Sequence, residues 1–381
     1  MGKNLGLYLH VPFCRSKCIY CDFYSLPQAE EQIDRYIEAL CRHLEAAAAR
    51  CEGYTVDTVY LGGGTPSYLG RERLETVLDA VHKFYHIAEN AEVTLEANPD
   101  STGDKKMIRA LREAGVNRVS LGVQSADDRM LRLLGRPHSF AQAEGAVAGL
   151  RQGGIENISL DLIYGLPGQT MGHWQETLER TAALSPEHLS CYGLKVEEGT
   201  PLASMEAREA IPDSDAQADF YLWTVRRLEE LGYGQYEISN FARPGRHSQH
   251  NMKYWTLGEY LGLGPGAHSD LGGVRFAWAR DLGAYCRGVE AGGLEPETAE
   301  AVSRDQRALE YLMLGLRTAN GVSAGEFEGA FQRPFAPVEA SLTPLIRTGH
   351  VLRNGDRWRL SPEGFLVSNQ IIGRVLEAAG I

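Results

Sequence analysis

The sequence predicts an α/β fold in which six strand–helix units form an incomplete barrel, followed by a small helical domain. Three observations lead to this prediction. Short runs rich in β-branched residues alternate with helical patterns over roughly the first 235 residues, which is typical of a parallel sheet with crossover helices. Polar or glycine-rich segments follow nearly every run. Beyond residue 300 the pattern changes to helices with one short hairpin.

Each β-rich run is followed by a helical pattern. The expected strands are Leu5–Val11, Val56–Leu61, Val93–Ala97, Arg118–Val123, Ile158–Ile163 and His188–Leu194. The expected helices are Gln32–Ala49, Arg71–Tyr85, Lys105–Ala114, Phe140–Gln152, Trp174–Leu184 and Ala216–Leu231. Six units fit either an open sheet or a barrel that lacks two of the usual eight members. Ligand sites in β/α barrels gather at the carboxyl ends of the strands, where this chain has its polar segments, and this favours the barrel.

Three domains are predicted along the chain. Residues 1–235 form the partial barrel, and the aromatic, glycine-rich residues 236–300 extend its sheet or cap its mouth. Residues 301–381 form a helical, winged-helix-like domain, because a hairpin turned by Asn354-Gly355-Asp356 lies among its helices. The helices expected there are Asp305–Thr318, Val322–Phe331, Val338–Arg347 and Phe365–Ala378, and the hairpin strands are Val351–Arg353 and Trp358–Leu360.

The composition is that of a globular protein, with 43% hydrophobic and 23% charged residues and a formal charge of −12. Without a basic block, a nucleic-acid partner is not expected. No apolar stretch reaches the roughly 20 residues of a transmembrane helix, and the amino terminus lacks the features of a secretion signal. We therefore expect a cytosolic protein.

Three of the seven cysteines form a C-x3-C-x2-C run, Cys14, Cys18 and Cys21. In a reducing compartment such closely spaced cysteines are metal ligands or catalytic thiols rather than disulfides. Soft thiolates favour zinc or an iron–sulfur cluster. A zinc site would need His10 or Asp22 as a further ligand, since no second cysteine pair exists. The isolated cysteines are expected to be packing thiols: Cys41, Cys51, Cys191 and Cys286.

A C-x3-C-x2-C run after a first β-strand resembles the radical S-adenosylmethionine (SAM) superfamily. The resemblance implies a [4Fe–4S] cluster held by Cys14, Cys18 and Cys21, with one iron left open for the amino and carboxylate groups of SAM. In that superfamily, one electron from the cluster cleaves the sulfonium to give a 5′-deoxyadenosyl radical. No catalytic residue beyond the cluster is assigned.

The same resemblance assigns a set of SAM contacts, most of which fall at or just after a strand end. The glycine-rich turn Gly62–Pro66 resembles the motif that contacts the amino group of SAM, and glycines allow close approach of the backbone. Taken singly, each residue could instead be a surface or capping residue. The SAM contacts that the resemblance implies are Tyr8, Tyr20 (through its backbone), Gly63, Gly64, Thr65, Glu96, Gln124, Arg136 and Asp161.

Over essentially its whole length the chain resembles the branch that contains oxygen-independent coproporphyrinogen III dehydrogenase and the HemW haem chaperones. The segments that carry this resemblance are Gly122–Ser125, Asp161–Thr170 and Gly262–Ser269. Two features separate the chain from the dehydrogenase. Phe23 stands where the dehydrogenase has another cysteine, and only 13 residues precede Cys14, whereas the dehydrogenase has a long extension.

A third feature is His250-Asn251-Met252-Lys253-Tyr254-Trp255, which matches the HNxxYW motif associated with haem in HemW. A neutral imidazole is a good axial ligand, so the resemblance makes His250 the expected haem ligand, with Tyr254 and Trp255 beside the macrocycle. The alternative is that His250 and Asn251 satisfy backbone groups in a loop. The preceding residues 246–249 depart from the Cys-Arg pair often found there, and His247 and His268 are secondary candidates.

The function that the resemblance implies is a haem chaperone that binds haem and a SAM-liganded [4Fe–4S] cluster. Its partners would be haem, a haem-acceptor protein and an electron donor for the cluster. The alternatives are the oxidative decarboxylation of coproporphyrinogen III and a radical SAM methyl transfer. The sequence does not identify the acceptor.

Overall fold

The computed structural model describes residues 3–102 and 104–380. The chain forms two compact units, of which the first is Met1–Gln217 with Glu259–Glu300 and the second is Ala218–Gly258 with Ala301–Ile381. Residues 218–258 therefore pack with the C-terminal segment. These units are defined by how the chain packs and do not test the domain limits expected at 235/236 and 300/301. Those limits stay a prediction.

The first unit is built on a sheet whose strands are hydrogen-bonded in the order β14-β13-β12-β11-β1-β4-β5-β6-β7-β8. From β1 to β8 every neighbouring pair is parallel, which confirms the predicted incomplete β/α barrel. The strands are β1 (Lys3–Val11), β4 (Tyr54–Gly63), β5 (Ile87–Ala97), β6 (Arg118–Gln124), β7 (Asn157–Tyr164), β8 (His188–Gly193), β11 (Tyr260–Leu263), β12 (His268–Leu271), β13 (Val274–Ala277) and β14 (Thr298–Ala301), with the short pair β2 (Phe13–Cys14) and β3 (Leu26–Pro27) beside them.

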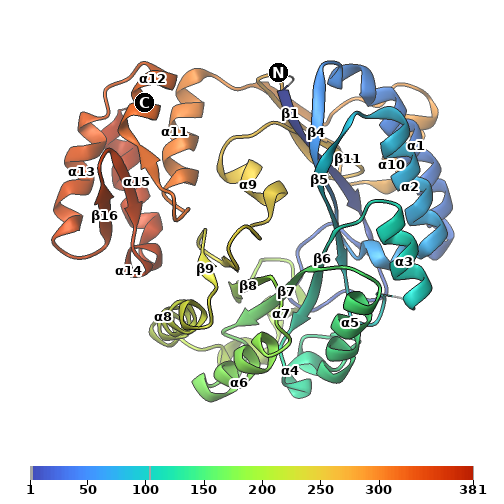
Figure 1. Ribbon diagram of the computed structural model, residues 1–381, viewed down its shortest axis with the longest axis horizontal. Helices are drawn as coiled ribbons and strands as arrows, with labels where there is room; N and C mark the ends of the chain where they lie inside the picture. Colours follow the sequence, from blue (N-terminus) through green and yellow to red (C-terminus); the bar gives the residue numbers. More distant parts are fainter. Residues whose placement is uncertain (1–2, 103, 381) are drawn as a thin grey trace. The chain divides into compact units, whose positions relative to one another are not determined.

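Helices of the first unit cover the outer face of the curved sheet (Figure 1). The helix α4 was not predicted, because a helix this short shows no clear periodicity. The helices are α1 (Ile33–Ala48), α2 (Arg71–Phe84), α3 (Lys105–Glu113), α4 (Asp128–Leu133), α5 (Phe140–Gln152), α6 (Met171–Ala182), α7 (Pro201–Ser204) and α10 (Leu282–Glu290). Five of the six expected barrel helices lie here, within a few residues of their expected limits.

The strands of the barrel bury apolar side chains on one face and polar side chains on the other. The apolar face carries Leu95, Leu121 and Leu160, one from each of β5, β6 and β7, and all three are almost fully buried. The residues next to these leucines along each strand lie on the opposite face, together with Glu96 and Asp161. The buried polar residues of that face include Thr58, Thr94, Arg118, Ser159 and Ser190. Since β/α barrels are usually filled with branched apolar residues, this polar interior marks the inside of the barrel as a region of chemistry.

The second unit is mainly helical. Within it α13 packs on α15, and α11 packs on α9, α12 and α15. A small antiparallel sheet has the order β15-β17-β16, so the helical domain with a small β-wing is confirmed. The elements are α8 (Ser214–Glu230), β9 (Gly234–Gln235), β10 (Asn240–Ala242), α9 (Gln249–Trp255), α11 (Arg304–Gly315), β15 (Val322–Ser323), α12 (Ala324–Phe331), α13 (Ala336–Ile346), β16 (Val351–Asn354), β17 (Arg357–Leu360), α14 (Pro362–Leu366) and α15 (Ser368–Ala379).

Three details of this unit differ from the sequence prediction. The first two residues of the expected helix 322–331 form β15, because Ser323 caps α12 by accepting a hydrogen bond from the amide of Glu326. The expected helix 365–378 is two helices that meet at Val367. Residues 249–255 form α9, although few helices were expected in that segment.

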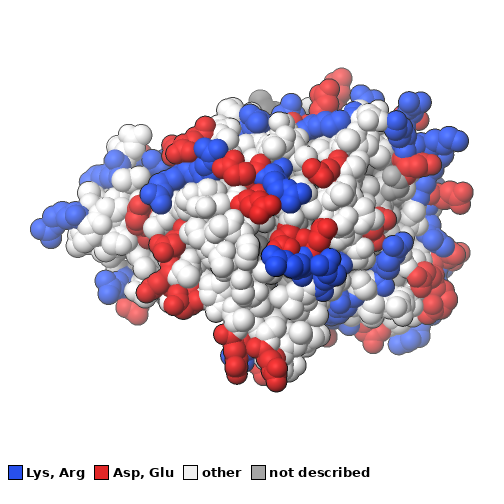
Figure 2. All heavy atoms as spheres, turned by 90° about the horizontal axis from the view of Figure 1, so that it is seen from below, with Lys and Arg blue, Asp and Glu red and all other residues white. Residues whose placement is uncertain are grey.

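Two observations concern the surface and the length of the helices. On the face shown in Figure 2, acidic and basic side chains are interspersed rather than gathered by sign. Within residues 3–102 and 104–380, no helix combines the length and the apolar character needed to cross a membrane.

Candidate functional site

The three closely spaced cysteines lie in the segment between β1 and α1. Cys14 ends β2, and the amide of Cys21 donates to the carbonyl of Cys18 at 3.2 Å. The segment then returns, since the amide of Gln28 donates to the carbonyl of Cys14. Cys18 is buried and the other two cysteines are half-buried. The backbone therefore curls round, as a compact centre with three thiolate ligands requires.

The neutral thiol is favoured at two of the three cysteines, Cys14 and Cys21. Burial raises the pKa of Cys14, and the neighbouring Cys18 raises it further. Burial likewise raises the pKa of Cys21, with Cys18 again adding to the effect. Three thiolates in this setting need metal charge to hold them deprotonated. An all-thiolate set of this kind suits an iron–sulfur cluster.

Two side-chain donors face the cysteine sulfurs. The Thr65 hydroxyl lies 3.5 Å from Cys14 Sγ, and Arg136 Nη1 lies 3.5 Å from Cys18 Sγ. Asn98 connects them, because its Nδ2 donates to Thr65 Oγ1 (3.1 Å) and its Oδ1 accepts from Arg136 Nη2 (2.6 Å). A continuous hydrogen-bonded path thus joins two of the sulfurs. Hydrogen bonds to sulfur tune iron–sulfur clusters.

His10, which could complete a zinc site, is occupied by protein partners. Its Nε2 donates to the carbonyl of Tyr24 (3.0 Å), which leaves Nδ1 to accept from the Tyr8 hydroxyl (3.0 Å). Burial lowers the pKa of His10 to about 4, so the ring is neutral at pH 7. Asp22 is exposed. Among the described residues, no group of three or more His, Cys, Asp and Glu side chains is arranged to hold a single metal ion.

Glu96 and the glycine-rich turn interlock at the ends of β4 and β5. The carboxylate accepts from the Tyr60 hydroxyl (2.8 Å) and from the amide of Gly63 (3.0 Å). Burial raises the pKa of Glu96 to about 7, and the nearby Asp161 contributes. A Cβ on Gly63 would lie 2.4 Å from His10 Cε1. Close packing between strands therefore requires this glycine.

The backbone amides of the turn have partners inside the protein. The amide of Gly64 donates to the carbonyl of Val11, and that of Thr65 to the carbonyl of Phe13, each at 2.8 Å. With the amide of Gly63 bound to Glu96, all three donors are used. An amino group of a ligand is itself a donor, so at this turn it would require carbonyl or carboxylate oxygens.

Asp161 lies inside the barrel among serine hydroxyls that sequence reasoning missed. Ser120 Oγ donates to its carboxylate oxygens at 3.2 and 3.0 Å, and Ser159 Oγ at 3.3 Å. Burial raises the pKa of Asp161. Arg118 is 1% exposed, and within the described part of the chain its Nε and Nη1 have no hydrogen-bond partner. In the sequence, the charged Arg118 within an otherwise apolar strand was the signal that could have indicated this polar interior.

Gln124 has a left-handed backbone, with φ of 66°, at a register shift between Gly122 and Gln124 in the β6–β7 pairing. Such a conformation is rare for a residue other than glycine and often marks a functional position. The shift interrupts the alternation of side chains between the two faces of β6. The segment after Gln124 therefore helps to set the direction of its side chain.

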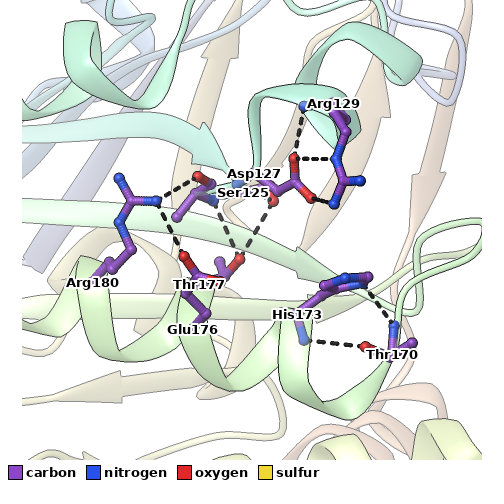
Figure 3. Close-up of polar contacts among 9 residues, drawn as sticks. Ser125, Asp127, Arg129, Thr170, His173, Glu176, Thr177 and Arg180 are labelled. Carbon is purple, nitrogen blue, oxygen red and sulfur yellow. Dashed lines mark hydrogen bonds and ion pairs between the residues drawn. The ribbon is translucent and has the colours of Figure 1, made fainter.

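Helix α6 holds the segment after Gln124 (Figure 3). Thr177 Oγ1 lies 3.4 Å from Ser125 Oγ and accepts from the amide of Ala126 at 3.3 Å. Arg180 Nη1 donates to the carbonyl of Ala126 at 3.1 Å. The helix begins with a capping box between Thr170 and His173. Thr170, the last residue of the Asp161–Thr170 motif, therefore begins the helix that supports the segment after Gln124.

Tyr20 belongs to the cysteine segment, and with Ile19 it packs against a buried apolar cluster that includes Met130, Leu134 and Leu166. Gly63 and Gln124 end β4 and β6, and all candidates for the cluster and SAM sites lie in the first unit. These residues are Tyr8, Tyr20, Gly63, Gly64, Thr65, Glu96, Gln124, Arg136 and Asp161, with the three cysteines. Asn98 was missed, although it too follows a strand end.

The HNxxYW motif lies in the second unit, entirely within helix α9. His250 is fully buried, and its Nε2 lies 2.9 Å from the Tyr254 hydroxyl. Ser248 caps the helix by accepting from the amide of Asn251. His247 is exposed and stacks on Tyr236, with 4.3 Å between ring centroids and 14° between planes. His268, on β12 of the first unit, is exposed.

Comparison with protein families gives two matches within this chain. The radical SAM superfamily matches residues 8–181, a segment that contains all three closely spaced cysteines and every candidate SAM contact. The HemN C-terminal domain matches residues 302–367.

Comparison with solved structures finds the coproporphyrinogen III oxidase HemN from Escherichia coli, described as a radical SAM enzyme. The TM-score is 0.86, and the alignment covers 99% of this chain and 90% of that one. At 24% identity this likeness concerns the fold.

Comparison with curated proteins gives relatives that match over nearly their whole length. The heme chaperone HemW of Mycobacterium tuberculosis is 38% identical over 380 residues, covering 98% of this chain and 95% of its own. The heme chaperone HemW of Escherichia coli is 35% identical over 374 residues, covering 97% of each. Since these identities extend over nearly the whole of both chains, the chain belongs to the HemW family, within the radical SAM superfamily.

Proposed function

We propose that this protein is a haem chaperone, which binds haem and a SAM-liganded [4Fe–4S] cluster and passes haem to an acceptor protein. The curated relatives of matching length are named heme chaperones. The observation that carries the proposal is the set of three thiols with polar donors on two sulfurs, in a chain that also has the HNxxYW motif.

Cys14, Cys18 and Cys21 would hold the cluster, and Thr65 and Arg136 would donate to its sulfur ligands. A cluster with three protein ligands supplies an open iron and an electron to a bound sulfonium. The residues round it would orient the cofactor, with Glu96 and Asp161 accepting hydrogen bonds and Gln124 set by its strained backbone. Arg136 Nε, which is buried and has no partner within the described residues, remains available to a ligand carboxylate.

The partners would be haem, an unidentified acceptor and an electron donor for the cluster. We further propose a cytosolic location, because a three-thiolate cluster requires reduced cysteines. All seven cysteines of the chain are free thiols in the structure.

The enzymatic alternative is coproporphyrinogen III dehydrogenase. Phe23 occupies the place of a further cysteine in that enzyme and is 64% exposed beside Cys21, which favours the chaperone. Anaerobic incubation of the reconstituted protein with coproporphyrinogen III separates the two functions. Rapid conversion to the decarboxylated product would overturn the chaperone proposal.

The test of the proposal is anaerobic reconstitution with iron and sulfide, followed by SAM binding and haem transfer to a haem-free acceptor. We expect about four irons per wild-type chain, and far fewer in a variant with Cys14, Cys18 and Cys21 changed to alanine. Cys41→Ala is the matched control, because Cys41 lies outside the segment. Wild-type protein that stays colourless, or that binds no haem, would refute the proposal.

A further inference from the structure

The histidine of the haem-associated motif, His250, is not available to bind iron in this structure. An axial bond to iron needs an imidazole nitrogen that faces the macrocycle. His250 is 0% exposed, and its Nε2 is engaged with Tyr254 at 2.9 Å, the two rings meeting edge to face with 5.3 Å between centroids. In this arrangement, His250 serves to fix the helix α9.

His247, three residues earlier, has the opposite properties. Its ring is exposed, and among the described residues neither ring nitrogen has a hydrogen-bond partner. One face of the ring stacks on Tyr236, which directs the ring while leaving its edge open. A neutral imidazole with an open edge of this kind is a good axial ligand for haem iron.

Tyr236 is itself held firmly. The side chain is 5% exposed, its hydroxyl accepts from the amide of Ser248 at 3.4 Å, and its amide donates to the carbonyl of Asn240 at 3.1 Å. The stacked imidazole therefore rests on a fixed support that is joined to the cap of α9. Such a support restricts the ring before a ligand arrives, which lowers the entropy cost of binding.

The charge round His247 suits an anionic ligand. The chain has a formal charge of −12, yet between Glu237 and Glu259 the sequence contains no Asp or Glu and three cations, Arg243, Arg246 and Lys253. Arg243 lies over the Tyr233 ring, 4.6 Å from its centroid, and Lys253 is 9% exposed. Arg246 is exposed next to His247. Its guanidinium can pair with a carboxylate through two parallel hydrogen bonds.

From these observations we infer that His247 is the axial ligand of the haem iron and that Arg246 pairs with a haem propionate. This inference rests on the proposed haem-chaperone function and names the residues of its haem site. His250 acts as a positioning residue through Tyr254 and the helix that follows His247. Ser248, which follows His247, caps α9 with its hydroxyl, and it carries no thiolate that could bind the iron.

The test is haem titration of the full-length protein, followed by absorbance and by electron paramagnetic resonance of the ferric complex. We expect His247→Ala to weaken haem binding at least tenfold and to remove the spectrum of the wild-type axial ligand. Added imidazole should restore that spectrum. His247→Met should bind haem with a different spectrum, because thioether sulfur replaces nitrogen at the iron. Arg246→Ala should weaken binding several-fold without a spectral change.

His86→Ala serves as the control, since His86 is another exposed histidine, in the first unit. Thermal melts of each variant establish that it is folded. The inference is overturned if His247→Ala keeps the wild-type spectrum and affinity, or if His250→Ala alone loses the axial-ligand signal. A wild-type protein that binds no haem would instead refute the chaperone proposal, so the two failures are distinct.

Discussion

Single residues in the candidate site act through their partners more than through their own chemistry. Arg136 lies fourteen or more residues from the other members of its network in sequence, yet contacts Cys18, Asn98 and the carbonyl of Gly122. Asn98 completes a path from one cysteine sulfur to another. The loss of one member therefore leaves several polar atoms without partners.

Gln124 allows a test of whether backbone strain serves binding. We expect Gln124→Gly to leave the free energy of unfolding unchanged or to raise it by up to about 1 kcal/mol, because glycine relieves the positive φ. SAM affinity should fall about tenfold, because the side-chain amide is lost. Chemical denaturation and equilibrium dialysis of the reconstituted protein measure the two quantities. Equal SAM affinity in variant and wild type would exclude Gln124 from the SAM site.

At the scale of elements, helix α6 acts as a support for the turn after β6. The barrel fold alone does not specify how a strand end is held. Here, Thr177 and Arg180 on α6 bind the segment 125–126. Ser125 is fully buried, so this contact excludes water.

Thr177→Val tests this support while keeping the shape of the side chain. We expect a loss of about 1–3 kcal/mol in the free energy of unfolding, because the buried amide of Ala126 loses its acceptor. SAM affinity should fall as well, since the turn after Gln124 loosens. Thr181→Val is the matched control, one turn along the same helix, where the hydroxyl donates to a carbonyl of its own helix, that of Thr177. If the two variants bind SAM alike, α6 does not position Gln124.

Across the whole molecule, each compact unit contains a buried glutamate whose pKa burial raises to about 7. Glu96 lies in the first unit and Glu237 in the second. Within the described residues, Glu237 Oε1 has no hydrogen-bond partner. Both folded-state values exceed the ordinary value of 4.5, so each of these two carboxyls binds more protons in the folded than in the unfolded chain between about pH 4.5 and 7.

The contribution of each of these glutamates to the free energy of unfolding should therefore fall as pH rises from about 4.5 to 7, and level off above that. We expect Glu237→Gln to stabilise the chain at pH 8 by about 1–3 kcal/mol and to have little effect at pH 5, where the wild-type carboxyl is already neutral. Urea denaturation at both pH values measures this. The exposed Glu89→Gln should show no such difference. A stabilisation of equal size at both pH values would contradict the assignment to protonation.

The order and type of the barrel elements could be read from the chain because they depend on local periodicity. The expected strand Val93–Ala97 lies within β5, and the expected helix Phe140–Gln152 is α5 with the same limits. Helix α9 was missed because seven residues with mixed polarity show no amphipathic stripe. The helix expected at 365–378 is two helices, since the break at Val367 has no glycine or proline to announce it.

The sequence by itself determined the fold class, the family and the candidate residues at the strand ends, because residue type, spacing and periodicity are local properties. Only the tertiary structure decided which of these side chains are free to act. It buried His250, exposed His247, used the amides of the glycine-rich turn and joined the cysteine sulfurs through Asn98. The reason is physical, because burial and hydrogen bonding depend on segments that are distant in the chain and meet only when it folds.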